Sequence, residues 1–320
     1  MKRSARLLVG LLVVAACGTG GGNPTTLTDD PTTTPASQTT VLEEAFPVTV
    51  EGDNGPVTIE ATPEAIVSLS STATEMLFAI GAGPQVVAVD DQSNHPERAP
   101  VTDLSGFTPN IEAILSYEPD LVVVGFEPGG VVEALAAADI PVIFYDAATT
   151  LDETYDQIEG LGVATGHREE AIAVNETVRQ GIEAAIAKAP DLPEGTDYYH
   201  EVDNTYFTAT STTFIGQIYS MFGLENIADP ADEDGSSFGY PQLSSEYIVA
   251  ADPDLIFLAN SSYGESPETV AQRPGWDVLT AVREGNVVGL DSDIVSRWGP
   301  RVVEFAESIS DALASYVSQS

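Results

Sequence analysis

Glu112-Ala-Ile-Leu-Ser-Tyr-Glu-Pro-Asp120 and Glu246-Tyr-Ile-Val-Ala-Ala-Asp-Pro-Asp254 are two copies of one sequence pattern, 134 residues apart. Each copy follows a residue type that caps helices, Asn110 or Ser244, and each runs directly into four apolar residues, Leu-Val-Val-Val or Leu-Ile-Phe-Leu. A cap, a short helix and a buried strand used twice predict two similar α/β lobes. Two lobes create a cleft between them, and a cleft is where a ligand binds.

The segments around the first copy alternate between strand and helix patterns. Asp53-Asn-Gly55 lies between two short alternating runs and predicts a β-hairpin. Thr72 followed by Glu75 resembles a capping box, which opens a helix that Gly81 ends. Apolar runs separated by helices are typical of a largely parallel sheet. The further elements expected in this half are strands at 66–69, 86–89, 121–124 and 142–145 and helices near 112 and from 130 to about 138.

A long helical segment separates the two halves. Arg168 to Lys188 is rich in Ala, Glu, Ile and Val and has no Pro, so it predicts one helix of about 20 residues, roughly 30 Å long. Strands are expected again near residues 198, 255 and 287, and a final helix from about 300 to 317. The expected fold is therefore α/β, with two Rossmann-like lobes of mainly parallel sheets bridged by one long α-helix. The boundaries are 46–165 for the N-terminal lobe, 166–190 for the bridging helix and 191–320 for the C-terminal lobe.

The N-terminus has the pattern of an export signal. Lys2, Arg3 and Arg6 precede an apolar run from Leu7 to Ala16 that is too short to span a bilayer. The run ends in small residues before Cys17, which resembles a bacterial lipobox, and Cys17 is the only Cys in the chain. We expect residues 1–17 to be a lipoprotein signal, with Cys17 carrying the lipid; an inert Cys behind an ordinary signal peptide is the alternative. Residues 18–45, rich in Gly, Thr, Pro and Asp, predict a flexible tether. The expected location is the outer face of the cytoplasmic membrane, reached through the lipid anchor alone.

The charge of the chain is strongly negative. Its 50 acids outnumber 11 Lys and Arg, which gives a formal net charge of −39, and three of those bases lie in the expected signal. Such a surface repels phosphate, so nucleic acid is excluded as a partner. The acids are spread along the chain, which favours a solubilising surface of the kind suited to high salt over a site for one cationic partner.

Five further motifs occur in a fixed order along the chain. They are Ile66-Val-Ser-Leu-Ser-Ser-Thr-Ala-Thr-Glu-Met-Leu-Phe-Ala-Ile-Gly81, Asn94-His-Pro96, Asn110-Ile-Glu112 with Pro119-Asp120, Tyr240-Pro-Gln-Leu-Ser-Ser-Glu246 and Trp298-Gly-Pro-Arg301. Together they resemble the ferric-siderophore and vitamin B12 binding proteins of ABC importers. The resemblance covers about residues 60 to 318, and it rests on the order and spacing of the motifs rather than on any single one.

The resemblance implies a function in transport. Proteins of this family bind a metal chelate between two α/β lobes and deliver it to a membrane permease. It also implies that Glu112 and Glu246 dock with Arg residues of the permease, one acid from each lobe. The local alternative is that each acid stabilises the first turn of its own helix. An ABC permease and a small-molecule metal chelate are thus the expected partners, and the protein is expected to be a monomer.

Candidate cleft residues lie on loops at strand ends. Aromatic faces suit a corrin or an aryl siderophore through stacking, and an Arg suits an anionic group on the ligand. Core packing is the alternative for each aromatic, and a structural salt bridge is the alternative for Arg301. The candidates are Phe107, Phe126, Tyr206, Phe207, Tyr240, Arg297, Trp298 and Arg301, with His95 as a weaker one.

The residues favour a metal chelate over a bare metal ion as the ligand, and they leave the type of chelate open. With only His95, His167 and His200, the chain lacks the cluster that a bare metal site needs, so we expect no metal site and no cofactor apart from a metal carried inside the chelate. An iron-siderophore or related chelate is favoured, cobalamin is the alternative, and haem with His200 or a Tyr as axial ligand is a further one. We expect no enzymatic activity, because no Gly-x-Ser-x-Gly elbow, HExxH or P-loop occurs. An exported hydrolase and a surface adhesin are the competing classes.

Overall fold

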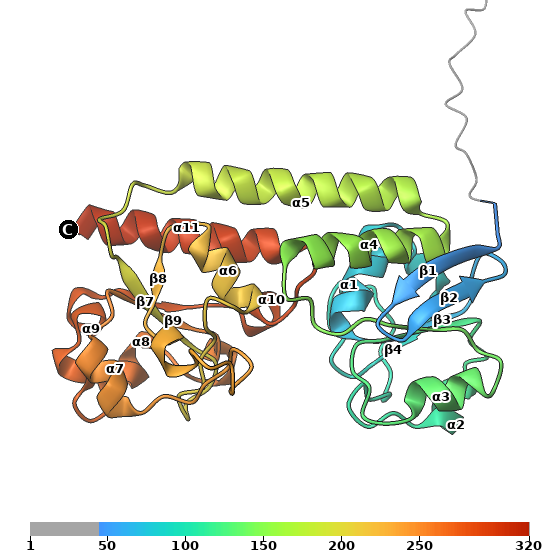
Figure 1. Ribbon diagram of the computed structural model, residues 1–320, viewed down its shortest axis with the longest axis horizontal. Helices are drawn as coiled ribbons and strands as arrows, with labels where there is room; N and C mark the ends of the chain where they lie inside the picture. Colours follow the sequence, from blue (N-terminus) through green and yellow to red (C-terminus); the bar gives the residue numbers. More distant parts are fainter. Residues whose placement is uncertain (1–44, 320) are drawn as a thin grey trace, which may run out of the picture. The chain divides into compact units, whose positions relative to one another are not determined.

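A computed structural model describes residues 45–319. They form two α/β lobes, each built on a four-stranded parallel sheet, with the long helix α5 (Arg168–Lys188) running across both (Figure 1). The predicted fold class is confirmed. The expected signal, lipidation site Cys17 and tether lie outside the described residues, apart from the last residue of the tether. No helix among residues 45–319 is both long and apolar enough to cross a bilayer.

The N-terminal lobe has the strand order β4-β3-β5-β6, all parallel, beside the antiparallel hairpin β1–β2. Its strands are β1 (Val48–Gly52), β2 (Gly55–Ile59), β3 (Ile66–Leu69), β4 (Val86–Val89), β5 (Leu121–Val124) and β6 (Val142–Phe144). Its helices are α1 (Ser71–Ala79), the 3-10 turn η1 (Gly83–Gln85), α2 (Ile111–Leu115), α3 (Val131–Ala136) and α4 (Leu151–Thr165).

Alternate residues of the N-terminal strands enter two different cores. In β5, Leu121 and Val123 face α1 and α4, whereas Val122 and Val124 face α2 and α3. This period of two follows from the pleat of a strand, and burial on both faces explains why these strands are apolar throughout. The sheet is therefore a fully covered middle layer, and only its strand ends can contribute residues to a site.

The C-terminal lobe repeats this plan with the strand order β10-β9-β7-β8, all parallel. Its strands are β7 (Asp197–Glu201), β8 (Glu225–Asn226), β9 (Leu255–Leu258) and β10 (Val287–Gly289). Its helices are α6 (Phe214–Ser220), η2 (Asp229–Ala231), α7 (Ser245–Ala251), η3 (Ser261–Tyr263), α8 (Pro267–Ala271), η4 (Trp276–Val278), α9 (Thr280–Glu284), α10 (Ser292–Val295) and α11 (Val302–Gln319).

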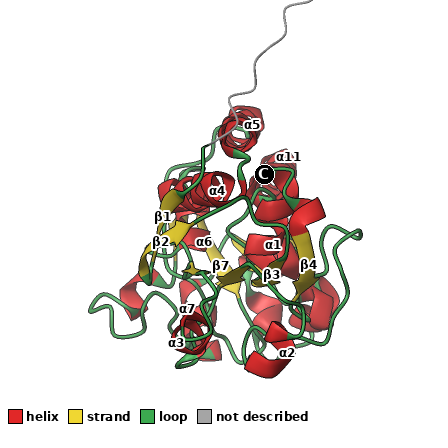
Figure 2. Ribbon diagram, turned by 90° about the vertical axis from the view of Figure 1, so that its right-hand side faces the viewer, coloured by secondary structure: helices red, strands yellow, loops and turns green. Residues whose placement is uncertain are grey.

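The two helix layers of the molecule lie on opposite sides of the sheets. Helices α4, α5 and α11 lie on one side, and α2, α3 and α7 lie on the other, as both views show (Figures 1 and 2). Helix α5 buries Val178 and Ile182 in the same core as Phe305 and Ile309 of α11. The first half of α5 packs against α4 of the N-terminal lobe, where it buries Ala171, so the bridge contacts both lobes, which favours a fixed arrangement of the two.

The repeated sequence pattern has the same structural role in both lobes. Asn110 caps α2 by accepting the Ala113 N–H at 3.1 Å, and Ser244 caps α7 in the same way. The Asp that ends each copy accepts backbone N–H groups beside the neighbouring strand: Asp120 from residues 64 and 65, just before β3, and Asp254 from Asp197 of β7. The pattern therefore fastens a short helix and its strand to a central strand of each sheet.

The capping box expected at Thr72 and Glu75 is wrong. Ser70 is the N-cap of α1 and accepts the Ala73 N–H at 3.2 Å, while Thr72 and Glu75 are buried inside the helix. Gly81 does follow the end of α1, with φ of 93°. Helix α4 has no counterpart among the expected elements. His167 is half-buried at the start of α5, and its Nδ1 lies 3.0 Å from Thr165 O.

His200 in β7 is fully buried, and its Nδ1 lies 3.0 Å from the Tyr219 hydroxyl. Burial lowers the pKa of His200 from 6.5 to about 3. Between these two pH values the unfolded chain binds a proton that the folded chain does not, so acidification should destabilise the fold by up to about 1.4 kcal/mol per pH unit. His200→Phe should flatten the pH dependence of unfolding free energy from pH 6.5 to 4.5, measured by urea denaturation. The exposed His95→Gln serves as control, and an unchanged slope in His200→Phe would contradict this assignment.

Candidate functional site

A cleft of about 400 Å³ lies between the two lobes. One wall is formed where β3, β4, β5 and β6 end, since the carboxyl ends of parallel strands meet at one edge of a sheet. The other wall comes from η3, α10 and the segment before α11. The first wall contains Leu69, Ser70, Ser71, Thr72, Asp90, Gln92, Gly106, Phe107, Gly125, Phe126, Asp146 and Ala147, and the second contains Tyr263, Asp293, Ser296, Arg297 and Trp298. These residues define the interlobe cleft.

Two aromatic rings form the apolar part of the N-terminal wall. The Phe107 and Phe126 centroids are 5.8 Å apart, and the side chains are 62% and 47% exposed. Because the two exposed rings are in contact, they form a contiguous apolar patch, the kind of surface that marks a binding site more often than a single exposed side chain does. The backbone beneath them is tightly packed, because a Cβ on Gly125 would lie 2.5 Å from Ser70 Oγ. The two rings therefore rest on a tightly packed base.

Trp298 and Tyr263 provide aromatic surface on the C-terminal wall. Trp298 is half-buried, and its Nε1 donates to Gln157 Oε1 of α4 at 2.8 Å. This bond fixes a C-terminal-lobe indole against an N-terminal-lobe helix. Tyr263 is 84% exposed at the end of η3. Sequence reasoning identified Trp298 but missed Tyr263.

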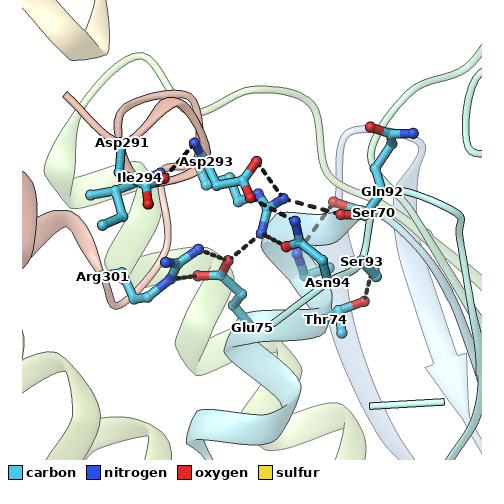
Figure 3. A network of polar contacts seen from close by, with 12 residues as sticks. Ser70, Thr74, Glu75, Gln92, Ser93, Asn94, Asp291, Asp293, Ile294 and Arg301 are labelled. Carbon is cyan, nitrogen blue, oxygen red and sulfur yellow. Dashed lines mark hydrogen bonds and ion pairs between the residues drawn. The ribbon is translucent and has the colours of Figure 1, made fainter. Parts of the chain in front are cut away.

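A buried ion-pair network joins the lobes beside the cleft (Figure 3). Glu75 of α1 is 3% exposed and accepts from both guanidinium groups of the segment that precedes α11. Arg297 Nη1 donates to Glu75 Oε1 at 2.7 Å. Arg301 donates to the same carboxylate from Nε at 2.9 Å and from Nη2 at 2.6 Å. The network continues through Asn94, which accepts from Arg297 at 2.9 Å and donates to Asp293 at 2.6 Å.

Arg297 is the one cationic side chain among the described residues that line the interlobe cleft. Both of its η nitrogens are engaged, because Nη2 also contacts Gln92 O at 3.0 Å and Asp293 Oδ1 at 3.0 Å. Two guanidinium groups thus balance two carboxylates, Glu75 and Asp293. The positive charge of Arg297 is already used within the protein, so it is not available to an anionic ligand.

The remaining charged groups of the cleft are acids. Asp90 is buried at the end of β4 and accepts the Ser93 hydroxyl, and burial raises the pKa of its carboxyl above the ordinary range. Asp146 is exposed at the end of β6. The electrostatic character of the cleft is therefore neutral to negative.

Four predicted ligand residues do not line the interlobe cleft. Tyr206 stacks on Trp276 at 5.8 Å, and Phe207 forms an isolated bridge with Gln242. Tyr240 is 43% exposed in the neighbouring loop, and Arg301 is held by Glu75 as described above. The four that do line it are Phe107, Phe126, Arg297 and Trp298.

The histidines are also absent from the cleft lining. His95 lines a separate small pocket, and His200 is enclosed in the C-terminal core, where it cannot reach a haem iron in the cleft. Across residues 45–319, no group of three or more His, Cys, Asp and Glu side chains is arranged to hold a metal ion.

Glu112 and Glu246 are exposed in the first turns of α2 and α7. Both helices lie on the side of the molecule that faces away from α5, one on each lobe (Figures 1 and 2). The two acids are thus carried by rigid, capped helices on one side of the protein.

Some cleft residues that the sequence did not reveal follow one rule. Ser70 and Asp90 stand directly after β3 and β4, and Asp146 stands two residues after β6, so the carboxyl-end rule could have identified them. Tyr263 and Asp293 follow β9 and β10 after longer connections, and no local sequence signal indicates that their side chains face the cleft.

Comparisons with known proteins agree with this architecture. The profile of a family described as periplasmic binding protein matches residues 66–294. An uncharacterized ABC transporter substrate-binding lipoprotein of Bacillus subtilis, YvrC, is 30% identical over 97% of this chain and 95% of its own length. A cobalamin-binding protein of Halobacterium salinarum is 32% identical over 81% of this chain and 72% of its own length.

Solved structures show the same fold. The periplasmic heme-binding protein RhuT from Roseiflexus sp. RS-1, in its apo form, is 26% identical and superposes with a TM-score of 0.68, covering 81% of this chain and all of that one. Two lobes, a cleft at the strand ends and a bridging helix thus occur together with the matching sequence profile. This chain belongs to the periplasmic binding protein family and is a substrate-binding protein of an ABC importer.

Proposed function

We propose that this protein binds cobalamin in the interlobe cleft and delivers it to an ABC permease. The observation that supports the proposal best is the charge of the cleft. Its one described cationic side chain, Arg297, is already ion-paired with Glu75 and Asp293, while Asp90 and Asp146 add negative charge. A desolvated anion would find no partner there, and leaving such a charge unpaired is costly.

Ligand charge separates the candidate chelates. Haem carries propionate groups and ferric catecholates are strongly anionic, so both need cationic side chains in the site. Cyanocobalamin has no net charge and presents a broad corrin face and amide side chains. Relatives named cobalamin-binding or vitamin B12-binding agree with this choice.

The aromatic walls suit a flat macrocycle. Phe107 and Phe126 expose ring surface on one lobe, and Trp298 and Tyr263 expose it on the other. Corrin amides can bond to the polar edge that Ser70, Asp90 and Asp146 provide. A ferric hydroxamate with neutral or positive charge is the second candidate, because it meets the same charge requirement and retains the iron chelate that the sequence favoured.

Calorimetric titration of the purified protein tests the proposal. The probes are cyanocobalamin, a cationic ferric hydroxamate, an anionic ferric catecholate and haemin, at one ionic strength. We expect the tightest binding for cyanocobalamin and none for the catecholate. Tightest binding of haemin or of the catecholate would overturn the proposal, and tightest binding of the hydroxamate would replace it with the second candidate.

Removing the paired rings should weaken ligand binding. Phe107→Ala with Phe126→Ala should raise the Kd for cyanocobalamin at least about tenfold, since an aromatic pair adds about 0.5–1.5 kcal/mol beyond its buried area. Phe238, which is 89% exposed and does not line the cleft, provides the matched control Phe238→Ala. Equal affinities for the double variant and the control would exclude the rings from the site.

We infer the location and the assembly state of the protein from the expected export signal and from the family. The protein is proposed to be held by a lipid on Cys17 at the outer face of the cytoplasmic membrane, to act as a monomer, and to have no catalytic activity. Metabolic labelling of intact cells with a palmitate analogue would test the anchor: label should be lost in Cys17→Ser. Retention of label in Cys17→Ser would exclude lipidation at this residue.

A further inference from the structure

A second pocket, of about 160 Å³, lies behind the interlobe network. Its lining comes from both lobes: α1 and the 95–98 loop from one, and the segment before α11 from the other. Glu75 and Arg301 form part of it, so the buried ion pairs stand between this pocket and the cleft that Arg297 lines. The residues that define the second pocket are Glu75, Phe78, Ala79, His95, Pro96, Arg98, Pro300 and Arg301.

The second pocket gathers basic side chains in a chain that has very few. Arg98 and Arg301 are two of the eight Lys and Arg that follow Cys17, and His95 is one of three His. Arg98 has no carboxylate within ion-pair distance among the described residues and lies over the Phe78 ring at 5.2 Å. In a protein with a net charge of −39, an unneutralised Arg beside a second Arg is unexpected.

The local charge balance favours an anion. Arg297 and Arg301 are matched by Glu75 and Asp293, which leaves the charge of Arg98 in excess. Glu75 is the one acid among the residues that line the pocket, and its carboxylate is already occupied by two guanidinium groups. A guanidinium offers several N–H donors in a plane, which suits a tetrahedral oxyanion.

We propose that the second pocket binds a small inorganic oxyanion of the phosphate or sulfate type. The anion would accept from Arg98 and His95 of one lobe and lie beside Arg301 of the other. It would therefore bridge the lobes on the far side of the Glu75 network from the ligand. The site is independent of the ligand proposed for the cleft.

Inorganic phosphate is the probe for the test and is added at constant ionic strength. A bulky organic anion, added in the same way, serves as the comparison. An anion that binds only the folded state raises its melting temperature in a saturable way. We expect a saturable rise with a half-maximum on the order of millimolar, and equilibrium dialysis should give one phosphate per chain. Sulfate should compete with phosphate.

Two charge-matched variants decide the case. Arg98→Gln should abolish the saturable rise and the bound phosphate, while Arg283→Gln, which removes another exposed Arg without a described carboxylate partner, should retain both. His95→Gln should weaken phosphate binding severalfold and reports on the site independently. The proposal would be overturned if both Arg variants kept the effect or if both lost it. It would also be overturned if the rise in melting temperature never saturated.

Discussion

Glu75→Gln is expected to lower the free energy of unfolding by about 3–5 kcal/mol, because it removes one partner from a buried ion-pair network. Glu75 holds Arg297 and Arg301 at once, through three hydrogen bonds of 2.6 to 2.9 Å. Without its charge, two largely buried guanidinium groups lose their shared partner. Urea denaturation at pH 7 measures the change.

The matched control is Glu304→Gln in the first turn of α11. Glu304 is exposed and close in sequence to Arg301, but its carboxylate makes no ion pair in the described structure. The control should stay within about 0.5 kcal/mol of the unmodified protein, the usual range for surface substitutions. A similarly small change in Glu75→Gln would show that the network contributes little.

The same variant also tests the ligand argument. In Glu75→Gln the Arg297 guanidinium is released from its buried partner beside the cleft, so the cleft gains an available positive charge. Binding of an anionic ferric catecholate should therefore increase relative to cyanocobalamin. This comparison is made by calorimetry on the folded fraction at low temperature. An unchanged ratio of the affinities for the catecholate and cyanocobalamin would show that the network does not determine which ligand binds.

Reversing charge at both Glu112 and Glu246 is expected to reduce uptake of the ligand by intact cells at least about tenfold, while ligand affinity stays unchanged. Both acids are exposed on helices that lie on the side away from α5, and neither lines the interlobe cleft. The expectation rests on the proposed role of these acids in meeting Arg residues of the permease, where opposite charges fix orientation as well as attraction.

Helix stability must be separated from docking in this test. Each reversal also opposes the helix dipole, at about 0.3–1 kcal/mol. Glu133→Arg with Glu268→Arg is the matched control, since these exposed acids occupy the first turns of α3 and α8. Uptake should be retained in the control. Retained uptake in Glu112→Arg with Glu246→Arg would remove the docking role.

Local sequence patterns predicted the fold well because each depends on residues that are near one another. The strand at 66–69, the capped helices after Asn110 and Ser244 and the long helix at 168–188 all occur as expected. The twin pattern was informative because Asp120 and Asp254 fasten equivalent strands, so its repetition reflects repeated structure.

The cleft was predictable only in part because its partners are distant in sequence. Glu75 matched a capping box by spacing, whereas its real partners are 222 and 226 residues away. Tyr206 and Tyr240 stand on loops of the expected kind, but the direction of a side chain at a strand end depends on packing, here against Trp276 for Tyr206. Arg301 follows the salt-bridge alternative that the sequence had left open.

A structure of the protein with cyanocobalamin bound is the most direct test of cobalamin binding in the interlobe cleft. We expect the corrin between the lobes, with Phe107 and Phe126 on one side and Trp298 on the other, and with Arg297 still bonded to Glu75. A corrin bound elsewhere, or a cleft that holds an anionic chelate on an Arg297 released from Glu75, would contradict it.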